Sequence, residues 1–207
     1  SEDIHRLSIN EKLISELQHL KYQLQPHFFF NSLNNIYSLI DRYPDKAKEV
    51  VHSLGKLMRY LLYETTAERV PLAKEIDFMK KYIELMQLRT SNNTIIHASF
   101  PSVDLSMQVP PLLFISLIEN AFKHGVAATQ ESEIGITMTL DEQHILFVTK
   151  NIYLPKDTTD KSGSGIGLLN LKKRLELIYP KGYILKSEII DSTYVSTLQI
   201  NYKEQVS

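Results

Sequence analysis

The chain has 207 residues, 43% of them hydrophobic, which suffices for one large domain or for a small domain with a helical appendage. Its net charge of −1 at pH 7 gives no general attraction to nucleic acid or to an anionic membrane surface, so we expect no nucleic-acid partner. The absence of cysteine excludes disulfides and thiolate metal sites.

Residues 4–41 are predicted to form one long helix. A packing seam with 4-3-4 spacing runs along its first half, formed by Leu13, Leu17, Leu20 and Leu24. Pro26 lies inside this pattern, where a proline removes a backbone hydrogen bond and kinks the helix at a cost of ~3 kcal/mol. After the proline the apolar side chains move to nearly the opposite side of the helix: Phe30, Leu33, Ile36, Tyr37 and Ile40.

The same helical register places His27 on the polar face, together with Asn31, Asn34, Ser38 and Asp41. An exposed imidazole on a locally distorted helix is open to a bulky phosphate donor, and neutral imidazole is a competent nucleophile near pH 7. Taken alone, His27 fits an ordinary surface histidine beside a kink better. Its role as a phosphoacceptor therefore depends on the rest of the chain.

A turn at residues 42–45 separates the first helix from a second one. The second helix carries one apolar stripe, made of Ala47, Val50, Leu54, Leu57, Leu61 and Leu62. So short a connection favours antiparallel neighbours, and a hairpin of two amphipathic helices cannot bury both of its seams by itself. We therefore expect a homodimer in which two hairpins form a four-helix bundle.

A third helical stripe follows Pro71, and from Thr94 the pattern changes from helix to strand. The stripe consists of Leu72, Ile76, Met79, Ile83 and Met86. Five later segments are predicted strands, at residues 95–100, 134–140, 145–149, 183–189 and 194–202. Helices are predicted at residues 111–124 and 168–179, which indicates an α/β sandwich. Residues 153–165 lack periodicity, and loops of this length are often functional.

Polar side chains collect at the end of the predicted helix 111–124. Asn120 offers a neutral oxygen to Mg²⁺, which favours hard oxygen ligands. Lys123 and His124 follow one turn later and can face the same phosphates, while Glu119 could take a proton or hold a metal-bound water. The alternative is a plain polar patch with Gly125 as the helix C-cap.

Three glycines, Gly163, Gly165 and Gly167, alternate just before the last predicted helix. Glycine lets backbone N–H groups approach phosphate, and a helix N-terminus favours an anion. The spacing matches neither a P-loop nor a dinucleotide-binding fingerprint, because no Gly-Lys-Ser/Thr follows and no βαβ unit precedes it. A flexible turn is the simpler interpretation of these glycines alone.

Together these segments resemble the LytS-type sensor histidine kinases over essentially the whole chain. The stretch from Gln25 to Asn31 is similar to that family's phosphoacceptor box, and the stretch from Glu119 to Gly125 to its N box. The stretch from Gly165 to Leu175 is similar to its glycine box and the following helix. Further similarity lies in Leu57-Met58-Arg59-Tyr60 and in the connector from Tyr82 to Arg89.

The resemblance implies an α+β fold in three parts. Residues 1–66 would be a helical dimerisation and histidine phosphotransfer domain, and residues 67–91 a connector helix. Residues 92–207 would be a GHKL-type ATP-binding domain, a Bergerat α/β sandwich. The implied reaction transfers the γ-phosphate of Mg-ATP to His27 and then to an aspartate in the receiver domain of a response regulator.

The expected site combines the residues of these motifs. His27 accepts the phosphate, and Glu119 and Asn31 are the candidates for helping with proton or water chemistry. Asn120, with Glu119, is expected at Mg²⁺. The expected contacts to ATP are Asn120, Lys123, His124, Asn151, Gly163, Gly165, Gly167 and Leu168.

Two positions depart from the family pattern. Such kinases have an Asp-Asn-Gly near the end of a strand, where the acid accepts from the adenine amino group, and the equivalent here is Lys150-Asn151-Ile152. Asn151 could offer its carbonyl instead, with weaker nucleotide binding as the expected consequence. Phe28 follows His27 where many histidine kinases carry an acid, as in LytS-type sequences, so the general base is not identified.

Two other functions compete with the kinase. The first is a degenerate, non-catalytic dimeric signalling module with weak or no ATP binding, which Lys150 favours. The second is an ATPase in which Glu119 activates water, although this leaves His27 and the bundle unexplained.

No apolar run approaches the roughly 20 residues of a membrane helix. Full-length relatives are usually anchored to the membrane by an upstream sensor. We therefore expect the chain to be the cytoplasmic portion of an inner-membrane protein, reaching the membrane only through an upstream segment outside this sequence.

Overall fold

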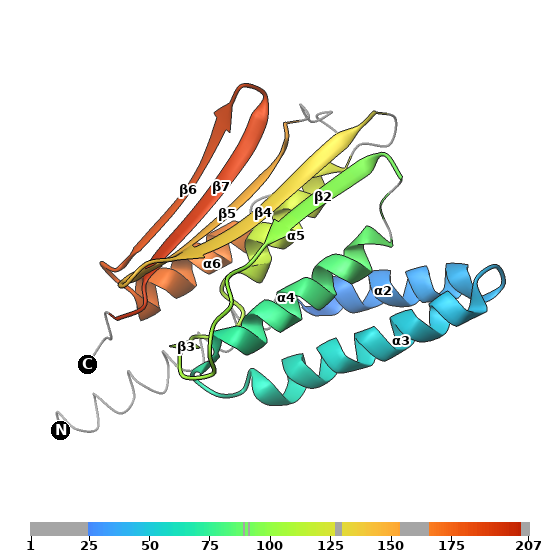
Figure 1. Cartoon of the computed structure of the whole chain (residues 1–207), viewed down its shortest axis with the longest axis horizontal. Helices are drawn as coiled ribbons and strands as arrows, with labels where there is room; N and C mark the ends of the chain where they lie inside the picture. The colour runs from blue at the N-terminus through green and yellow to red at the C-terminus, as the bar shows by residue number, and fades with distance from the viewer. Residues whose placement is uncertain (1–24, 89, 91, 127–129, 154–165, 204–207) are drawn as a thin grey trace.

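The computed structural model describes residues 25–88, 90, 92–126, 130–153 and 166–203 (Figure 1). Its helical elements are α2 (Gln25–Ile40), α3 (Pro44–Arg59), the π-helical turn η1 (Tyr60–Glu64), α4 (Leu72–Gln87), α5 (Ile115–Gly125) and α6 (Ile166–Ile178). Its strands are β1 (Val70–Pro71), β2 (Thr94–Ser99), β3 (Gln108–Val109), β4 (Ser132–Leu140), β5 (His144–Ile152), β6 (Tyr183–Ile190) and β7 (Thr193–Asn201). The predicted α+β class is confirmed. No helix within these ranges is long and apolar enough to cross a membrane.

The helices α2 and α3 form an antiparallel hairpin, as the short connection predicts (Figure 1). The Tyr43 amide closes the turn by donating to the Leu39 carbonyl over 2.8 Å. Pro44 then starts α3, where a proline costs no helical hydrogen bond. The upstream part of the predicted long helix, residues 1–24, lies outside the described residues, and the kink at Pro26 stays a prediction.

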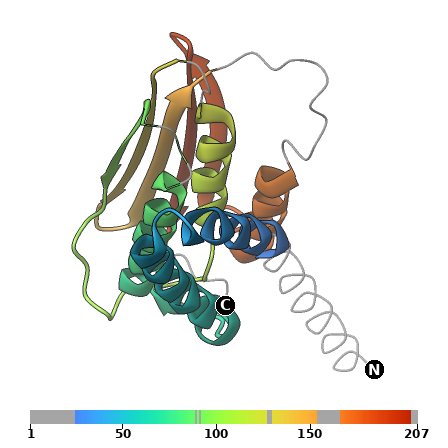
Figure 2. The same cartoon turned by 90° about the vertical axis from the view of Figure 1, so that its right-hand side faces the viewer.

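The second half of the chain forms a five-stranded mixed sheet with the order β2-β4-β5-β7-β6. β2 is parallel to β4, and the other neighbouring pairs are antiparallel. α5 and α6 cover one face of this sheet (Figure 2). Alternation along the strands puts the apolar side chains under the helices, including Ile134, Ile136, Ile145, Phe147, Leu198 and Ile200.

One hydrophobic core connects the hairpin to the sheet. α4 contacts α3 and α5 and lies between the two parts (Figure 1). Tyr60 of η1 stacks on Phe78 of α4 with ring centroids 5.0 Å apart, and Phe114 meets Phe147 of β5 edge-on at 5.3 Å. The three predicted segments thus share a core, while their exact boundaries stay predictions.

The helix predicted from residue 111 begins four residues later, at Ile115. Residues 111–114 form turns instead, and Leu112 adopts the left-handed conformation with φ of 61°. The backbone N–H and C=O of Leu112 are bound by Glu75 and Arg174. In a helix that began at residue 111 the Leu112 carbonyl would accept an intrahelical bond, whereas its N–H, in the first turn, would have no partner in the helix. Here Arg174 takes the carbonyl and Glu75 takes the N–H, and the left-handed backbone at Leu112 lets the helix start only after it.

Two short strands carry no signal in the sequence. β1 pairs antiparallel with β3, through Val70 with Val109 and Pro71 with Gln108. Two residues are too few for period-two alternation to be recognised. The pair ties the start of α4 to the segment that leads into α5, and the Leu72 amide adds a 2.8 Å bond to the Met107 carbonyl.

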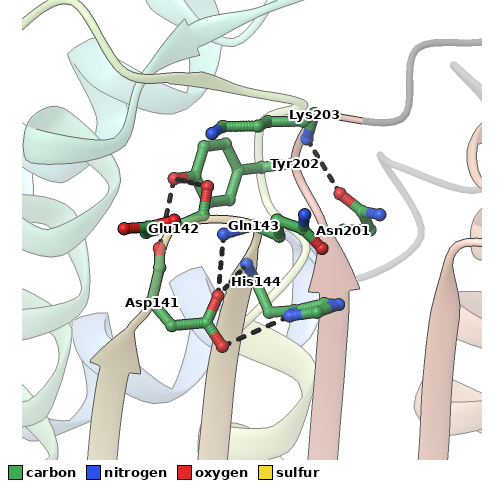
Figure 3. Close-up of polar contacts among 7 residues, drawn as sticks. All are labelled: Asp141, Glu142, Gln143, His144, Asn201, Tyr202 and Lys203. Atoms are coloured by element: carbon green, nitrogen blue, oxygen red, sulfur yellow. Dashed lines mark hydrogen bonds and ion pairs between the residues drawn. The ribbon is translucent and has the colours of Figure 1, made fainter.

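The turn between β4 and β5 is held by its own side chains (Figure 3). Asp141 accepts from the backbone N–H groups of Gln143 and His144 at 2.7 and 2.6 Å. These two bonds hold the pKa of the Asp141 carboxyl below its usual range. Tyr202, which follows β7, donates its hydroxyl to the Glu142 carbonyl at 2.9 Å. His144, whose ring nitrogen is 3.2 Å from Asp141, therefore has a structural role in this turn.

Candidate functional site

The helix α5 presents its polar residues at the end farther from Leu112. Leu117, Ile118, Ala121 and Phe122 are buried against the sheet and its neighbours. Glu119 and Asn120 are half-buried, His124 is half-buried and Lys123 is exposed. The motif residues predicted for Mg²⁺ and phosphate thus lie on one helix, on and beside its buried face.

The amide of Asn120 has an unmet hydrogen-bonding group. Its Nδ2 atom is buried and has no hydrogen-bond partner among the residues that the structure describes. A buried polar group without a partner costs about 1–3 kcal/mol, so native structures rarely keep one unless a ligand or water satisfies it. Rotation of the amide by half a turn would bring its oxygen to the same place, where it could bind a hard cation.

The carboxyl of Glu119 is the group of this site whose pKa is clearly shifted. Burial raises its pKa to about 8, although Lys123 one turn later on the helix lowers it in part. A carboxyl with this pKa exchanges its proton near neutral pH, as a general acid or base requires. In the described ranges no three histidine, aspartate or glutamate side chains come together as a metal site. A Mg²⁺ ion here would need phosphate oxygens and water as its other ligands.

Asn151 is a polar residue of β5 that faces the helices. It is 2% exposed and continues the buried alternation of Ile145, Phe147 and Thr149. Its Nδ2 atom donates to the Ile152 carbonyl at 3.0 Å. Lys150 is exposed and, by the same alternation, points to the other face of the sheet. Asn151 rather than Lys150 therefore lies on the face of the sheet that α5 and α6 cover, and its contact to adenine stays a prediction.

Gly125 lets the end of α5 approach β5 closely. A Cβ atom at this position would lie 2.5 Å from Cβ of Asn151 and 3.2 Å from Cγ1 of Ile134. The C-cap role considered for Gly125 is wrong, because Gly125 is the last residue of α5 and the extended Val126 is its C-cap. The glycine instead allows the close contact between the helix that carries Asn120 and the strand that carries Asn151.

The glycine loop is only partly described. Gly163 and Gly165 fall in residues 154–165, which lie outside the described part of the chain. Gly167 and Leu168 belong to the start of α6, and Leu168 packs against the hydrophobic core. α6 contacts α5, so the helix that follows the glycine motif and the helix that carries the asparagine motif lie on one side of the sheet (Figure 2).

The predicted phosphoacceptor lies on a different element. His27 is within α2, and its side chain is not among the described ones. Asn31, one turn later, is half-buried. The structure thus gathers Glu119, Asn120, Asn151, Gly167 and Leu168 on the α/β side, and leaves His27 and Asn31 on the hairpin. The roles of these residues stay predictions.

The sequence motifs do not include one buried acid, Glu75. Glu75 of α4 is completely buried and binds both Tyr60 and Leu112. The sequence does contain a signal, since Glu75 falls within the apolar stripe between Leu72 and Met79. A charge on the buried face of a helix indicates a specific partner.

Comparisons with known proteins agree with these features. The chain matches the family model described as histidine kinase over residues 15–94. It is 28% identical over 191 residues to the sensor protein LytS of Enterococcus faecalis, covering 86% of this chain and 32% of that protein. It is 28% identical over 204 residues to the sensor histidine kinase/phosphatase LytS of Staphylococcus aureus, covering 92% of this chain and 35% of that protein. The chain therefore spans about a third of the length of these curated relatives.

A solved structure shares the fold. The histidine kinase domain of the Erythrobacter litoralis EL346 blue-light activated histidine kinase superposes with a TM-score of 0.53 at 13% identity. The match covers 94% of this chain and 97% of that one. The arrangement of hairpin, α4 and α/β layer is thus similar to that of this solved domain.

Proposed function

The chain belongs to the LytS-type sensor histidine kinases, and from this premise we propose that it transfers the γ-phosphate of Mg-ATP to His27 and then to an aspartate of a response regulator. We extend the proposal to location: the chain acts as the cytoplasmic part of a longer, membrane-anchored sensor. The relatives carry the word sensor in their names, and the chain spans about a third of them.

The observation that carries the kinase proposal is the buried Asn120 amide. Its Nδ2 atom, which has no hydrogen-bond partner among the described residues, lies on the helix whose end, at Gly125, touches Asn151. A buried donor that the described residues leave unmet fits a site built for a polar ligand. Asn120 and Glu119 would hold Mg²⁺, Lys123 and His124 would contact phosphates, and Asn151 would contact adenine.

Bound Mg-ATP would supply the phosphoryl group and the metal charge that neutralises its oxygens. The contribution of the chain is positioning. His27 presents a ring nitrogen, which forms the new bond to phosphorus as the bond to ADP breaks. The ring must also lose a proton, and the Glu119 carboxyl is the candidate acceptor on the α/β side.

We also propose that the hairpin dimerises. Phe30, Leu33, Tyr37 and Ile40 are between 50% and 81% exposed in the single chain. Their 3-4-3 spacing is that of a helix-packing seam, and it lies outside the contact with α3, where Ile36 is buried. A second copy of the hairpin would cover this seam in a four-helix bundle.

Asn31 has a proposed role in removing phosphate. It lies one turn after His27, where an amide could orient a water molecule, and one relative is named a kinase/phosphatase. We expect Asn31→Ala to impair dephosphorylation of the regulator more than phosphorylation of the kinase. Equal loss of both activities would remove this role.

Incubation of the chain with γ-labelled ATP tests the main proposal. A kinase gives acid-labile label on the protein, and a receiver domain added afterwards takes that label up. Free phosphate without labelled protein would indicate the ATPase alternative. No label and no ATP binding at millimolar concentration would indicate the non-catalytic module. Lys150, the residue that favours the module, is exposed on the side of β5 away from the helices, which weakens that alternative.

A further inference from the structure

A buried carboxylate joins three segments of the chain at the start of the nucleotide-site helix. Glu75, in the first turn of α4, is 0% exposed. Its Oε2 atom accepts from the Leu112 backbone N–H at 3.0 Å, across 37 residues of sequence. Its Oε1 atom accepts a short hydrogen bond from the Tyr60 hydroxyl in η1. The carboxylate thus links the end of α3, the start of α4 and the segment that leads into α5.

A buried cation from α6 completes the arrangement. Arg174 of α6 is 6% exposed. Its guanidinium donates to the Leu112 carbonyl at 3.2 Å and, through a shorter bond, to the Pro111 carbonyl. Both backbone polar groups of Leu112 are therefore held by charged side chains from two other helices.

These contacts hold a backbone conformation that leucine does not prefer. Leu112 has φ of 61°, and the left-handed region costs a non-glycine residue roughly 1–2 kcal/mol. Such a conformation persists only where its surroundings enforce it. The bonds from Glu75 and Arg174 supply this enforcement, and α5 begins three residues later at Ile115.

Tyr60 and Arg174 keep their protonation states near neutral pH. Burial, followed by the Glu75 carboxylate, raises the pKa of the Tyr60 hydroxyl, so the tyrosine remains the donor. Burial lowers the pKa of Arg174 to about 10 against the opposing effect of Glu75, so the guanidinium stays charged. A buried charge without a partner is costly, which ties Glu75 and Arg174 to this geometry.

We propose that Glu75 and Arg174 are positioning residues for the nucleotide site, and that the Tyr60–Glu75 bond couples the placement of α5 to the phosphoacceptor hairpin. Asn120 lies less than two turns after Ile115, so the angle at which α5 starts sets where its amide lies. A shift of η1 relative to α4 would strain or break the Tyr60 bond and loosen Leu112. The hairpin and the nucleotide site are thereby joined by two hydrogen bonds to one carboxylate. The coupling to catalysis rests on the kinase function proposed above, whereas the coupling to α5 does not.

Hydrogen exchange on the nucleotide-free chain tests the link, with Tyr60→Phe as the variant. The substitution keeps the ring that stacks on Phe78 and removes only the hydroxyl. We expect amides in residues 112–120 to exchange about tenfold faster, while amides of β6 and β7 keep their wild-type rates. Tyr63→Phe is the matched control, because Tyr63 lies in the same π-helical turn and is 72% exposed. Unchanged exchange at residues 112–120 in Tyr60→Phe, or an equal increase in every segment, would overturn the proposal.

Titration of Mg-ATP extends the test to the site. We expect Tyr60→Phe to weaken binding roughly fivefold, a typical coupling between distinct sites, and Tyr63→Phe to leave it unchanged. Glu75→Gln keeps an acceptor for Leu112 but removes the charge that faces Arg174, and we expect it to change both exchange and affinity more than Tyr60→Phe does. If the wild-type chain does not bind Mg-ATP, the kinase function fails, and the exchange pattern still decides whether the hairpin controls α5. An exchange change without an affinity change in a chain that binds Mg-ATP would disprove the coupling to the site.

Discussion

The hairpin and the α/β layer differ in what they leave unsatisfied. The hairpin leaves apolar surface uncovered, and the α/β layer leaves a buried polar group without a described partner. The hairpin exposes apolar side chains that its own two helices cannot cover, such as Phe30 and Tyr37, which are 68% and 81% exposed. The α/β layer buries its apolar strand residues under α5 and α6, yet leaves the Asn120 amide buried without a described partner. Missing apolar contact indicates a protein surface, and a missing hydrogen bond indicates a polar ligand. These two features are the basis on which we propose a second copy at the hairpin and a nucleotide at the α/β layer.

The largest expected effect distinguishes the functions proposed for the two regions, which are phosphate acceptance by the hairpin and nucleotide binding by the α/β layer. We expect His27→Gln to abolish acid-labile labelling from ATP while titration calorimetry finds wild-type Mg-ATP binding, because the residues proposed to bind the nucleotide lie on α5, β5 and α6. His52→Gln, an exposed histidine of α3, serves as the control and should label normally. Labelling that persists in His27→Gln would move the phosphoacceptor to another residue.

A charge on the exposed seam should break the dimer and leave the α/β layer intact. Leu33 is 55% exposed in the single chain, and burying a glutamate there in a bundle would cost several kcal/mol. We expect Leu33→Glu to weaken dimerisation on the order of a hundredfold in sedimentation equilibrium, with unchanged ATP binding. Asn34→Glu places the same charge on the neighbouring polar position, which is also exposed, and should remain dimeric. Equal dissociation of both variants would argue against the seam.

Two glycines should respond in opposite directions to alanine. At Gly125 the added Cβ would lie 2.5 Å from Cβ of Asn151, so α5 and β5 must separate. We expect Gly125→Ala to lower the free energy of unfolding by about 1–3 kcal/mol and to weaken ATP binding. Gly55, inside α3, has no atom within 4 Å of such a Cβ, and Gly55→Ala should raise the free energy of unfolding by up to about 1 kcal/mol. Denaturant unfolding of both variants measures the contrast.

Stability of the nucleotide-free protein should depend on pH through Glu119. Its pKa is raised from 4.5 to about 8 by burial, so the folded state keeps a proton that the unfolded chain releases. Its contribution to stability is fully present below pH 4.5 and is lost as pH rises through about 8. We expect the free energy of unfolding to fall by only about 2–3 kcal/mol over this window. The half-buried Glu119 side chain is partly solvated, which limits the size of the effect. Glu119→Gln should flatten this part of the profile of unfolding free energy against pH, and an unaltered slope would contradict the assignment.

The smallest effect concerns the two neighbours at the end of β5. Lys150 is exposed, so we expect Lys150→Asp to leave the affinity for Mg-ATP unchanged within about twofold. Asn151→Asp would restore a charge-assisted hydrogen bond to adenine and should tighten binding by roughly tenfold. Tighter binding in Lys150→Asp would instead show that the strand presents its other face to the nucleotide.

Most of the secondary structure follows from the sequence, because an element that is buried on one face repeats its apolar residues with the period of a helix or a strand. The stripes of α3 and α4 and the alternation of β4, β5 and β7 predict these elements to within a few residues. The order of motifs also predicts that the asparagine helix and the glycine helix share a site, and α5 and α6 do lie in contact. Residues 1–24, Gly163 and Gly165 lie beyond the described part, and predictions for them stay open.

The tertiary structure alone decides features that depend on partners far apart in the chain. The alternation of the strand does not decide whether Lys150 or Asn151 faces the helices. Packing against Gly125 decides it, because Asn151 is the residue that is buried there. The start of α5 is similar. No local feature of residues 111–114 prevents a helix there. Glu75 and Arg174 nevertheless bind the Leu112 backbone and hold it in the left-handed conformation. A sequence pattern records which face of an element is buried, but not which distant polar group competes for its backbone hydrogen bonds.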